Sequence, residues 1–260
     1  MPRRKGSRPL LANGLLELRA LLEVSSFHAL RRQLPRIVPA GDGHPVLMLP
    51  GFLGADGSTG GLRRFLDHIG YAAHPWRQGR NPGFRRDVYE CLQSRLQELT
   101  DTHGRKVSLI GHSLGGIYAR TLAGEHPDLV RQVITLGTPF HIDRSAAQLG
   151  PVGRLYKLLN PQSATDSEFQ MTLAGRTPEV PTTSIYSRGD GIAPWRLCLD
   201  EGQGATENIR VPGSHAAMPF NLLVCYVVAD RLAQPEQSWC RFEAQGLARL
   251  LYASHLVSMN

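Results

Sequence analysis

The sequence predicts an α/β protein in which a mostly parallel sheet of about six strands carries helices on both faces. The first reason is that short apolar runs alternate along the chain with segments of helical periodicity. The second is that the clearest of these runs is apolar without alternation, which is typical of a strand buried on both faces. With 260 residues, the chain is long enough to form one such domain with a large core.

The predicted elements follow one another in a regular order. Residues 44–51 (HPVLMLPG) are the first predicted strand, because a continuous apolar run ends there in glycine turns. The further predicted strands are residues 106–111, 131–137, 182–187 and 207–213. The predicted helices are residues 62–70, 87–104, 114–125 and 219–232.

The helix over residues 87–104 carries its own boundary signals. We expect it to start with an Asp87-x-x-Glu90 capping box and to end at Gly104. Its buried stripe is predicted to consist of Val88, Cys91, Leu92, Leu96 and Leu99.

The chain divides into three parts. Residues 1–43 are a basic helical segment, residues 44–233 the main domain, and residues 234–260 a C-terminal extension. Within the main domain, a weakly patterned stretch at residues 140–180 separates two strands, which predicts a cap over a site. The extension is expected either to pack as a last helix or to form a loose tail.

The basic charge is concentrated at the N-terminus. Residues 1–36 contain eight Arg or Lys and two Glu, a net charge of +6, which leaves +1 of the total +7 for the remainder. Leucines near helical spacing predict a helix over residues 10–34. This helix either packs on the domain or contacts a membrane or lipid surface through leucines flanked by arginine. Because the body is nearly neutral and does not interleave basic and aromatic residues, nucleic-acid binding is not expected.

The cysteines and the apolar runs indicate the cellular compartment of the protein. Cys91, Cys198, Cys225 and Cys240 lack C-x-x-C spacing, which argues against zinc and against a disulfide framework. Cys225 lies in an apolar helical run and is predicted as a buried free thiol, with a Cys198–Cys225 bridge as the alternative. No apolar run reaches the roughly 20 residues that span a bilayer, and no secretory signal is evident. These observations favour a cytoplasmic protein, with peripheral membrane contact and secretion as alternatives.

Ser113 lies in a G-x-S-x-G pattern within residues 108–120 (SLIGHSLGGIYAR). The pattern alone is weak, because a glycine-rich chain contains it by chance. Here a predicted strand precedes it and a predicted helix follows, which is the context of a tight turn that presents a nucleophilic serine. Ser113 is therefore predicted as a nucleophile, with a purely structural turn as the alternative.

A serine hydroxyl needs an adjacent base, and the base needs an acid that orients it. In this arrangement the chain order is Ser, then Asp or Glu, then His. Of the ten histidines, His215 lies in a loop between a later strand and a helix, and it is predicted as the base. Asp190 follows the strand at residues 182–187 between two glycines and is predicted as the acid. Its rivals are Asp143, Asp166 and Asp200.

The oxyanion of a tetrahedral intermediate needs preorganised N–H donors. One donor is expected to be the backbone of Leu114, next to the nucleophile at a helix N-terminus. The other is expected in the loop LPGFLG after the first strand, where Phe52 is the first candidate and Leu53 the second.

The motifs LPGF, GHSLGG, TLGTPF, SIYSRGDGI and GSH occur here in the order found in α/β-hydrolases. Over residues 44 to about 233, the chain resembles a bacterial esterase or lipase of the α/β-hydrolase superfamily. The resemblance implies the α/β-hydrolase fold and ester hydrolysis through an acyl-enzyme, with no metal or organic cofactor. By position, it implies the same nucleophile, acid, base and oxyanion donors.

The chain departs from the family pattern in two places. Pro50 stands where relatives usually have histidine or another polar residue, and His141 follows GTPF where relatives often have glycine. His141, Leu53 and His112 are predicted as substrate contacts.

The leading function is a serine carboxylic-ester hydrolase, an esterase or lipase that acts on small-molecule or lipid acyl esters. Acyl transfer to an alcohol with the same triad is the alternative, and amide cleavage ranks third because no amine-recognition site is evident. Dehalogenation is disfavoured, because it needs a carboxylate where Ser113 stands. From a different class, a noncatalytic lipid- or membrane-binding protein is an alternative supported by the basic N-terminal segment.

Overall fold

The structure, a computed structural model, describes residues 19–140, 153, 158, 176–244, 249 and 252. Several predictions therefore fall outside the described residues. They are the first part of the N-terminal helix, most of the cap at residues 140–180, and the side chains of His141, Asp143 and Asp166.

Among the described residues, six strands form one sheet in the order β2-β1-β3-β4-β5-β6, and every neighbouring pair is parallel. Their bounds are β1 Pro45–Leu49, β2 Ala72–Pro75, β3 Val107–His112, β4 Val130–Leu136, β5 Thr182–Tyr186 and β6 Thr206–Arg210. β1, β3 and β4 are buried at every residue, which explains why apolar residues in them do not simply alternate with polar ones. The predicted α/β architecture is confirmed.

The edge strand β2 is not among the strands that the sequence predicts. Its four residues, AAHP, are mostly only half-buried, so neither an apolar run nor a clear alternation marks them. They pair with residues 45–48 of β1, with Ala72 opposite Pro45. A short strand that ends in proline is typical of a sheet edge.

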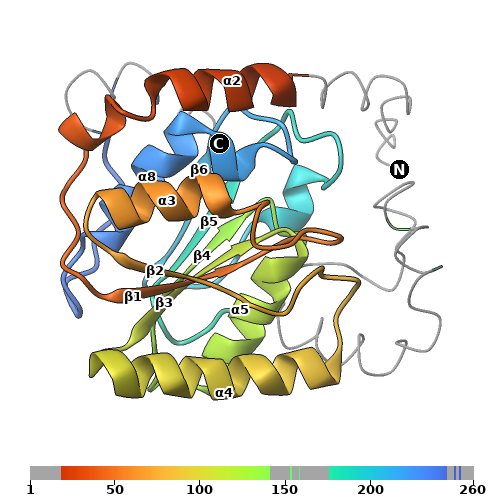
Figure 1. Ribbon diagram of the computed structural model, residues 1–260, viewed down its shortest axis with the longest axis vertical. Coiled ribbons are helices and arrows are strands. Elements are labelled where there is room, and N and C mark those ends of the chain that lie inside the picture. Colours follow the sequence, from red (N-terminus) through yellow and green to blue (C-terminus); the bar gives the residue numbers. More distant parts are fainter. Residues whose placement is uncertain are drawn as a thin grey trace.

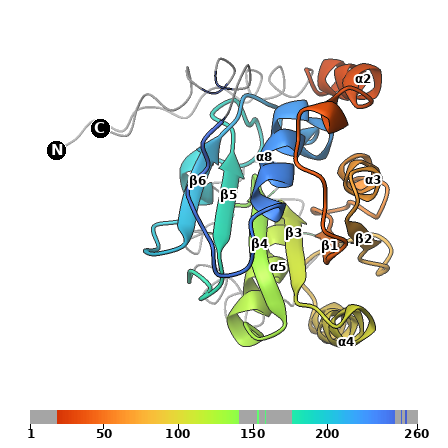
Figure 2. The same ribbon diagram turned by 90° about the vertical axis from the view of Figure 1, so that its left-hand side faces the viewer.

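Helices cover both faces of the sheet (Figure 1). The helices used below are α2 Ala20–Leu30, α3 Gly60–His68, α4 Arg86–His103, α5 Leu114–Glu125 and α8 Leu222–Leu232. α2, α3 and α8 enclose the core on one face, and α4 and α5 enclose it on the other. The perpendicular view shows the same two layers around the twisted sheet (Figure 2).

The boundaries of α4 agree with the prediction at one end and differ at the other. Gly104 ends the helix in the left-handed conformation with φ of 60°, as expected for glycine there. The predicted capping box is wrong, because α4 begins after Arg85 and has no side-chain cap. Asp87 instead accepts two hydrogen bonds from the Arg85 guanidinium, at 3.0 and 2.6 Å.

The predicted buried stripe of α4 also needs a correction. Leu92, Leu96 and Leu99 are buried as expected, but Cys91 is exposed and Tyr89 is buried in its place. Tyr89 can lie inside because its hydroxyl donates to the carboxylate of Glu125 on the neighbouring helix.

The cysteines behave as the simpler prediction requires. All four lie in the part of the chain that the structure describes, and all four are free, so the alternative Cys198–Cys225 bridge is not formed. Cys225 is fully buried in α8, and burial raises the pKa of its thiol.

The described part of the N-terminal segment forms α2, followed by a 3-10 turn over Leu34–Arg36. Phe27 and Leu34 are buried in the core, and Phe27 packs edge-on against Phe220. In contrast, Leu21 and Leu22 are 75% and 71% exposed. The leucines of α2 therefore do not form the side that packs on the domain. None of the described helices is both long and apolar enough to cross a membrane.

Part of the C-terminal extension packs on the domain. Phe242 and Tyr252 are buried beside Tyr226 of α8, with ring centroids 6.2 and 5.8 Å from it. The Tyr252 hydroxyl donates to the Leu223 carbonyl oxygen at 2.6 Å.

Candidate active site

Ser113 occupies a sharp turn between β3 and α5, as the sequence predicts. Its φ of 50° and ψ of −119° lie in a region that non-glycine residues rarely adopt. The glycines around it are sterically required. A Cβ at Gly111 would collide with the backbone of Gly116, and one at Gly115 would collide with the Leu49 carbonyl of β1. The strand and the helix therefore approach as closely as a nucleophile elbow demands.

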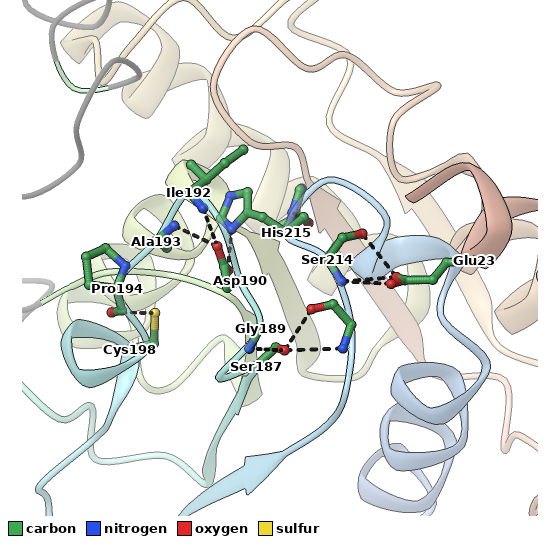
Figure 3. Close-up of polar contacts among 12 residues, drawn as sticks. Glu23, Ser187, Gly189, Asp190, Ile192, Ala193, Pro194, Cys198, Ser214 and His215 are labelled. Atoms are coloured by element: carbon green, nitrogen blue, oxygen red, sulfur yellow. Dashed lines mark hydrogen bonds and ion pairs between the residues drawn. The ribbon is translucent and has the colours of Figure 1, made fainter. Parts of the chain in front are cut away.

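Asp190 and His215 are brought together at the carboxyl ends of the last two strands. Asp190 lies in the loop after β5, and its Oδ2 is 2.6 Å from Nδ1 of His215, in the loop after β6 (Figure 3). Both side chains are buried. The second carboxylate oxygen, Oδ1, accepts hydrogen bonds from the backbone N–H groups of Ile192 and Ala193, at 2.8 and 2.7 Å. The carboxylate is thus held by its own loop and accepts a hydrogen bond from the Nδ1–H group, which leaves Nε2 as the basic nitrogen.

Two glycines, Gly51 and Gly137, lie beside the Ser113 turn and the Asp190–His215 pair. Ser113 N donates to the Leu136 carbonyl at the end of β4 at 2.8 Å, and Gly137 follows with a φ of +55°. A Cβ at Gly137 would lie 3.2 Å from both Asp190 Oδ2 and His215 Nδ1. On the other side, a Cβ at Gly51 would lie 3.1 Å from the Cβ of Ser113. The side chains of the site therefore lie at the carboxyl edge of the parallel sheet, where proteins with such sheets bind their ligands.

Asp200, the alternative candidate for the acid, forms an ion pair with Arg120. Its Oδ2 is 2.5 Å from the guanidinium of Arg120, and its Oδ1 accepts hydrogen bonds from Thr177 and from the Gly202 N–H. Both members of the ion pair are buried. Asp200 therefore has a structural partner in Arg120, whereas Asp190 contacts the imidazole of His215.

The loop after β1 is held by a residue that the sequence did not single out. Asn81 is fully buried; its side-chain amide donates to the Pro50 carbonyl, and its backbone N–H donates to the Gly54 carbonyl, both at 2.8 Å. The Leu53 N–H in turn donates to the Asn81 carbonyl at 2.6 Å. Leu53, the second candidate for an oxyanion donor, thus already uses its amide within the loop. Asn81 lies in an unpatterned stretch, RQGRNPGF, so no sequence signal marked it.

Leu114 is the first residue of α5. Amide groups in the first turn of a helix have no carbonyl partner within that helix, and they carry the positive end of its dipole. The backbone of Leu114 thus follows the serine directly, in the position that an oxyanion donor requires.

His112 makes a contact that its predicted role does not include. Its Nε2 lies 2.9 Å from the carbonyl oxygen of His215, and the two rings are 5.1 Å apart. Burial is the largest cause that lowers the pKa of His112 to about 3, followed by the nearby His215. The ring is therefore neutral at ordinary pH, and its Nε2–H donates to the backbone of the predicted base.

Comparison with known proteins agrees with this architecture. A family model described as the alpha/beta hydrolase fold matches residues 53–151. Among solved structures, lipase B of Aspergillus fumigatus is 18% identical with a TM-score of 0.59, and the match covers 79% of this chain and 58% of that one. This chain thus spans little more than half the length of the fungal lipase.

Two bacterial structures match over a larger share of their own length. A lipase of Bacillus licheniformis is 18% identical with a TM-score of 0.51, and the match covers 70% of this chain and 88% of that one. A pyrethroid hydrolase of Sphingobium faniae is 18% identical with a TM-score of 0.50, covering 74% and 98%. At this level of identity, the likeness concerns the fold. With a parallel sheet, a strained serine turn and a family model that matches residues 53–151, the chain has the α/β-hydrolase fold.

Proposed function

We propose that the protein is a serine carboxylic-ester hydrolase with Ser113 as nucleophile, His215 as general base and Asp190 as the acid that orients the base. The observation that carries the proposal is the buried Asp190–His215 contact of 2.6 Å at the same sheet edge as the strained Ser113 turn. Two lipases and a pyrethroid hydrolase among the structural neighbours are consistent with this chemistry.

The geometry supports a two-step reaction. Nε2 of His215 takes the proton from Ser113 Oγ as the oxygen attacks the ester carbonyl, and the imidazolium then protonates the leaving alcohol. Water, deprotonated by the same nitrogen, attacks the acyl-enzyme, and the imidazolium returns the proton to Ser113 Oγ as the bond to the acyl group breaks and the carboxylic acid leaves. The backbone N–H groups of Leu114 and Phe52 would stabilise the oxyanion, and each such donor is worth about 2.7–4 kcal/mol of barrier.

We expect the protein to hydrolyse p-nitrophenyl esters and to be labelled covalently by a fluorophosphonate probe. Peptide mass spectrometry should place the label on Ser113, because the probe reports a serine activated by a base. The optimum in acyl-chain length would divide esterase from lipase. Ester formation in the presence of an added alcohol would instead favour acyl transfer. Absence of both hydrolysis and labelling would contradict the proposal and favour a noncatalytic lipid-binding protein.

A second proposal concerns the exposed face of α2. Leu21, Leu22 and Leu30 are exposed, and Arg31, Arg32 and Arg36 follow them in the chain. The one acidic residue within α2, Glu23, is turned inward and accepts hydrogen bonds from Ser214. Exposed leucines next to cations suit the surface of an anionic bilayer.

We expect the protein to cosediment with vesicles that contain phosphatidylserine, more weakly with pure phosphatidylcholine. The double variant Leu21→Ser/Leu22→Ser should lose most of this binding, because burial of each leucine contributes about 1.5–3 kcal/mol. Its hydrolysis of a short soluble ester should stay unchanged. Vesicle binding that survives the substitutions would assign the contact to another part of the chain.

A further inference from the structure

The inner side of α2 faces the two loops that carry the acid and the base. A terminal guanidinium nitrogen of Arg19 donates to the Gly189 carbonyl at 2.8 Å and also to the Gly213 carbonyl. Gly189 immediately precedes Asp190, and Gly213 lies two residues before His215. One side chain from the N-terminal segment therefore joins the acid loop to the base loop.

Glu23, one turn further along α2, holds the next residue of the base loop. Its carboxylate accepts hydrogen bonds from the backbone N–H of Ser214 at 2.9 Å and from the Ser214 hydroxyl at 3.1 Å (Figure 3). The same carboxylate is 3.2 Å from Nε of Arg19. Ser214 is fully buried and adjoins His215, so an acidic side chain fixes the backbone directly before the base.

Side chains hold this loop at consecutive residues. The Pro212 carbonyl accepts from Asn221, the Gly213 carbonyl also accepts from Ser187, and the His215 carbonyl accepts from His112. These three partners belong to the sheet-and-helix domain itself. Arg19 and Glu23 come from a helix that precedes the first strand, so they add contacts that the domain does not make by itself.

An exposed ion pair on a helix contributes little to stability. Arg19 and Glu23 differ from such a pair because each also binds backbone groups within two residues of Asp190 or His215. Loops are the parts of a fold with the least local stability, and their amide and carbonyl groups need partners to hold one geometry. A displacement of a catalytic group by 1 Å is enough to cost about 100-fold in rate.

We infer that Arg19 and Glu23 are positioning residues that clamp the Asp190 and His215 loops in their reactive arrangement. This inference rests on the proposed function for its kinetic consequence, but its structural part concerns the two loops alone. It assigns a role in the reaction to the N-terminal segment, distinct from the contact of its outer face with lipid. Deletion of residues 1–36 would remove both roles together, so point substitutions are required.

The test compares Arg19→Ala, Glu23→Ala and Glu23→Gln with the wild type on a short soluble ester. We expect kcat to fall about 10- to 100-fold in the alanine variants, with KM changed less than about twofold, since the clamp acts on catalytic groups rather than on substrate binding. Glu23→Gln keeps one acceptor oxygen for the Ser214 N–H and should recover part of the loss.

Two matched controls separate positioning from general destabilisation. Glu98→Gln breaks an ion pair on α4, on the opposite face of the sheet, in which Arg95 and Glu98 are 2.6 Å apart. Leu22→Ser changes the exposed side of α2. Both should leave kcat unchanged. Hydrogen exchange measured by mass spectrometry should quicken in peptides covering residues 186–193 and 211–217 of the alanine variants, and not in the controls.

Unchanged kcat in a folded Glu23→Ala protein, or a loss of activity that merely follows the folded fraction, would overturn the inference. Hydrogen exchange needs no substrate, so it tests the clamp even if the wild type cleaves no ester. Local loosening of the two loops without any ester hydrolysis would therefore uphold the clamp and reject the proposed function. Exchange that does not change in either loop would reject the clamp alone.

Discussion

Replacement of Ser113 by alanine is expected to lower kcat/KM for p-nitrophenyl esters by about 100,000-fold or more, because no other group supplies the acyl-accepting oxygen. The residual rate would come from binding and the oxyanion donors. The strain of the elbow is stored in its backbone, and alanine leaves the small neighbours untouched, so the folded structure should persist. Initial rates and circular dichroism on the same preparation test both parts.

Ser108 offers a matched control in β3, the strand that leads into the Ser113 turn. Its hydroxyl is 2.9 Å from Nε2 of His44, and Nδ1 of His44 is 2.5 Å from Asp42, so the contacts imitate a catalytic triad. Ser108 and His44 are fully buried near the amino ends of β3 and β1, at the opposite edge of the sheet from Ser113. Burial is the largest cause that lowers the pKa of His44 to about 4.

We expect Ser108→Ala to keep the activity of each folded molecule and to cost about 1–3 kcal/mol of unfolding free energy, since a buried nitrogen of His44 loses its partner. Ser113→Ala is thus expected to change activity, and Ser108→Ala to change stability. Equal loss of activity in both variants, with both proteins folded, would remove the case for Ser113 as the nucleophile.

Replacement of Asp190 by asparagine is expected to lower kcat by about 10,000-fold with little change in the folded structure. The amide would present either an N–H group or a neutral oxygen to Nδ1 of His215, so the imidazole loses the partner that fixes its tautomer and stabilises its cation. The backbone contacts of Oδ1 with Ile192 and Ala193 remain available to an amide oxygen. Steady-state kinetics and urea denaturation give the two readouts.

Asp200→Asn is the control for this substitution, and the opposite outcome is expected. The change leaves the guanidinium of Arg120 buried without its anion, which typically costs about 3–5 kcal/mol. Activity per folded molecule should stay near that of the wild type. A large loss of kcat in folded Asp200→Asn, with normal kcat in Asp190→Asn, would instead assign the role of the catalytic acid to Asp200.

The ion pair between Asp200 and Arg120 should also affect how the stability of the protein depends on pH. Burial alone would raise the pKa of Asp200, but the charge of Arg120 and hydrogen bonds from Thr177 and Arg120 outweigh it and lower the pKa below its ordinary value. A lowered pKa in the folded state gives stability above the unfolded pKa of about 3.9 that is lost as the pH falls further. Asp200→Asn should therefore flatten the acid side of the stability profile.

Much of the fold could be predicted because its signals are local. The first strand of the sheet interior is a continuous apolar run, and α5 follows Ser113 directly, so pattern and length placed both elements. The edge strand β2 escaped prediction because its pairing with β1, not its composition, makes it a strand. The capping box of α4 was wrong because Asp87 has a competing partner, the adjacent Arg85 side chain, that spacing alone does not reveal.

By itself, the sequence determined the elbow around Ser113 and the strand ends at which Asp190 and His215 lie. Glycine requirements, strand patterns and chain order are properties of short segments, so they can be inferred from the residues in order. Tertiary structure decided that Asp190 rather than Asp200 meets the imidazole, and that Arg19, Glu23, Asn81 and His112 hold the loops around it. Arg19 and Gly213 are 194 positions apart in the chain, and such contacts arise from packing, which no local pattern encodes.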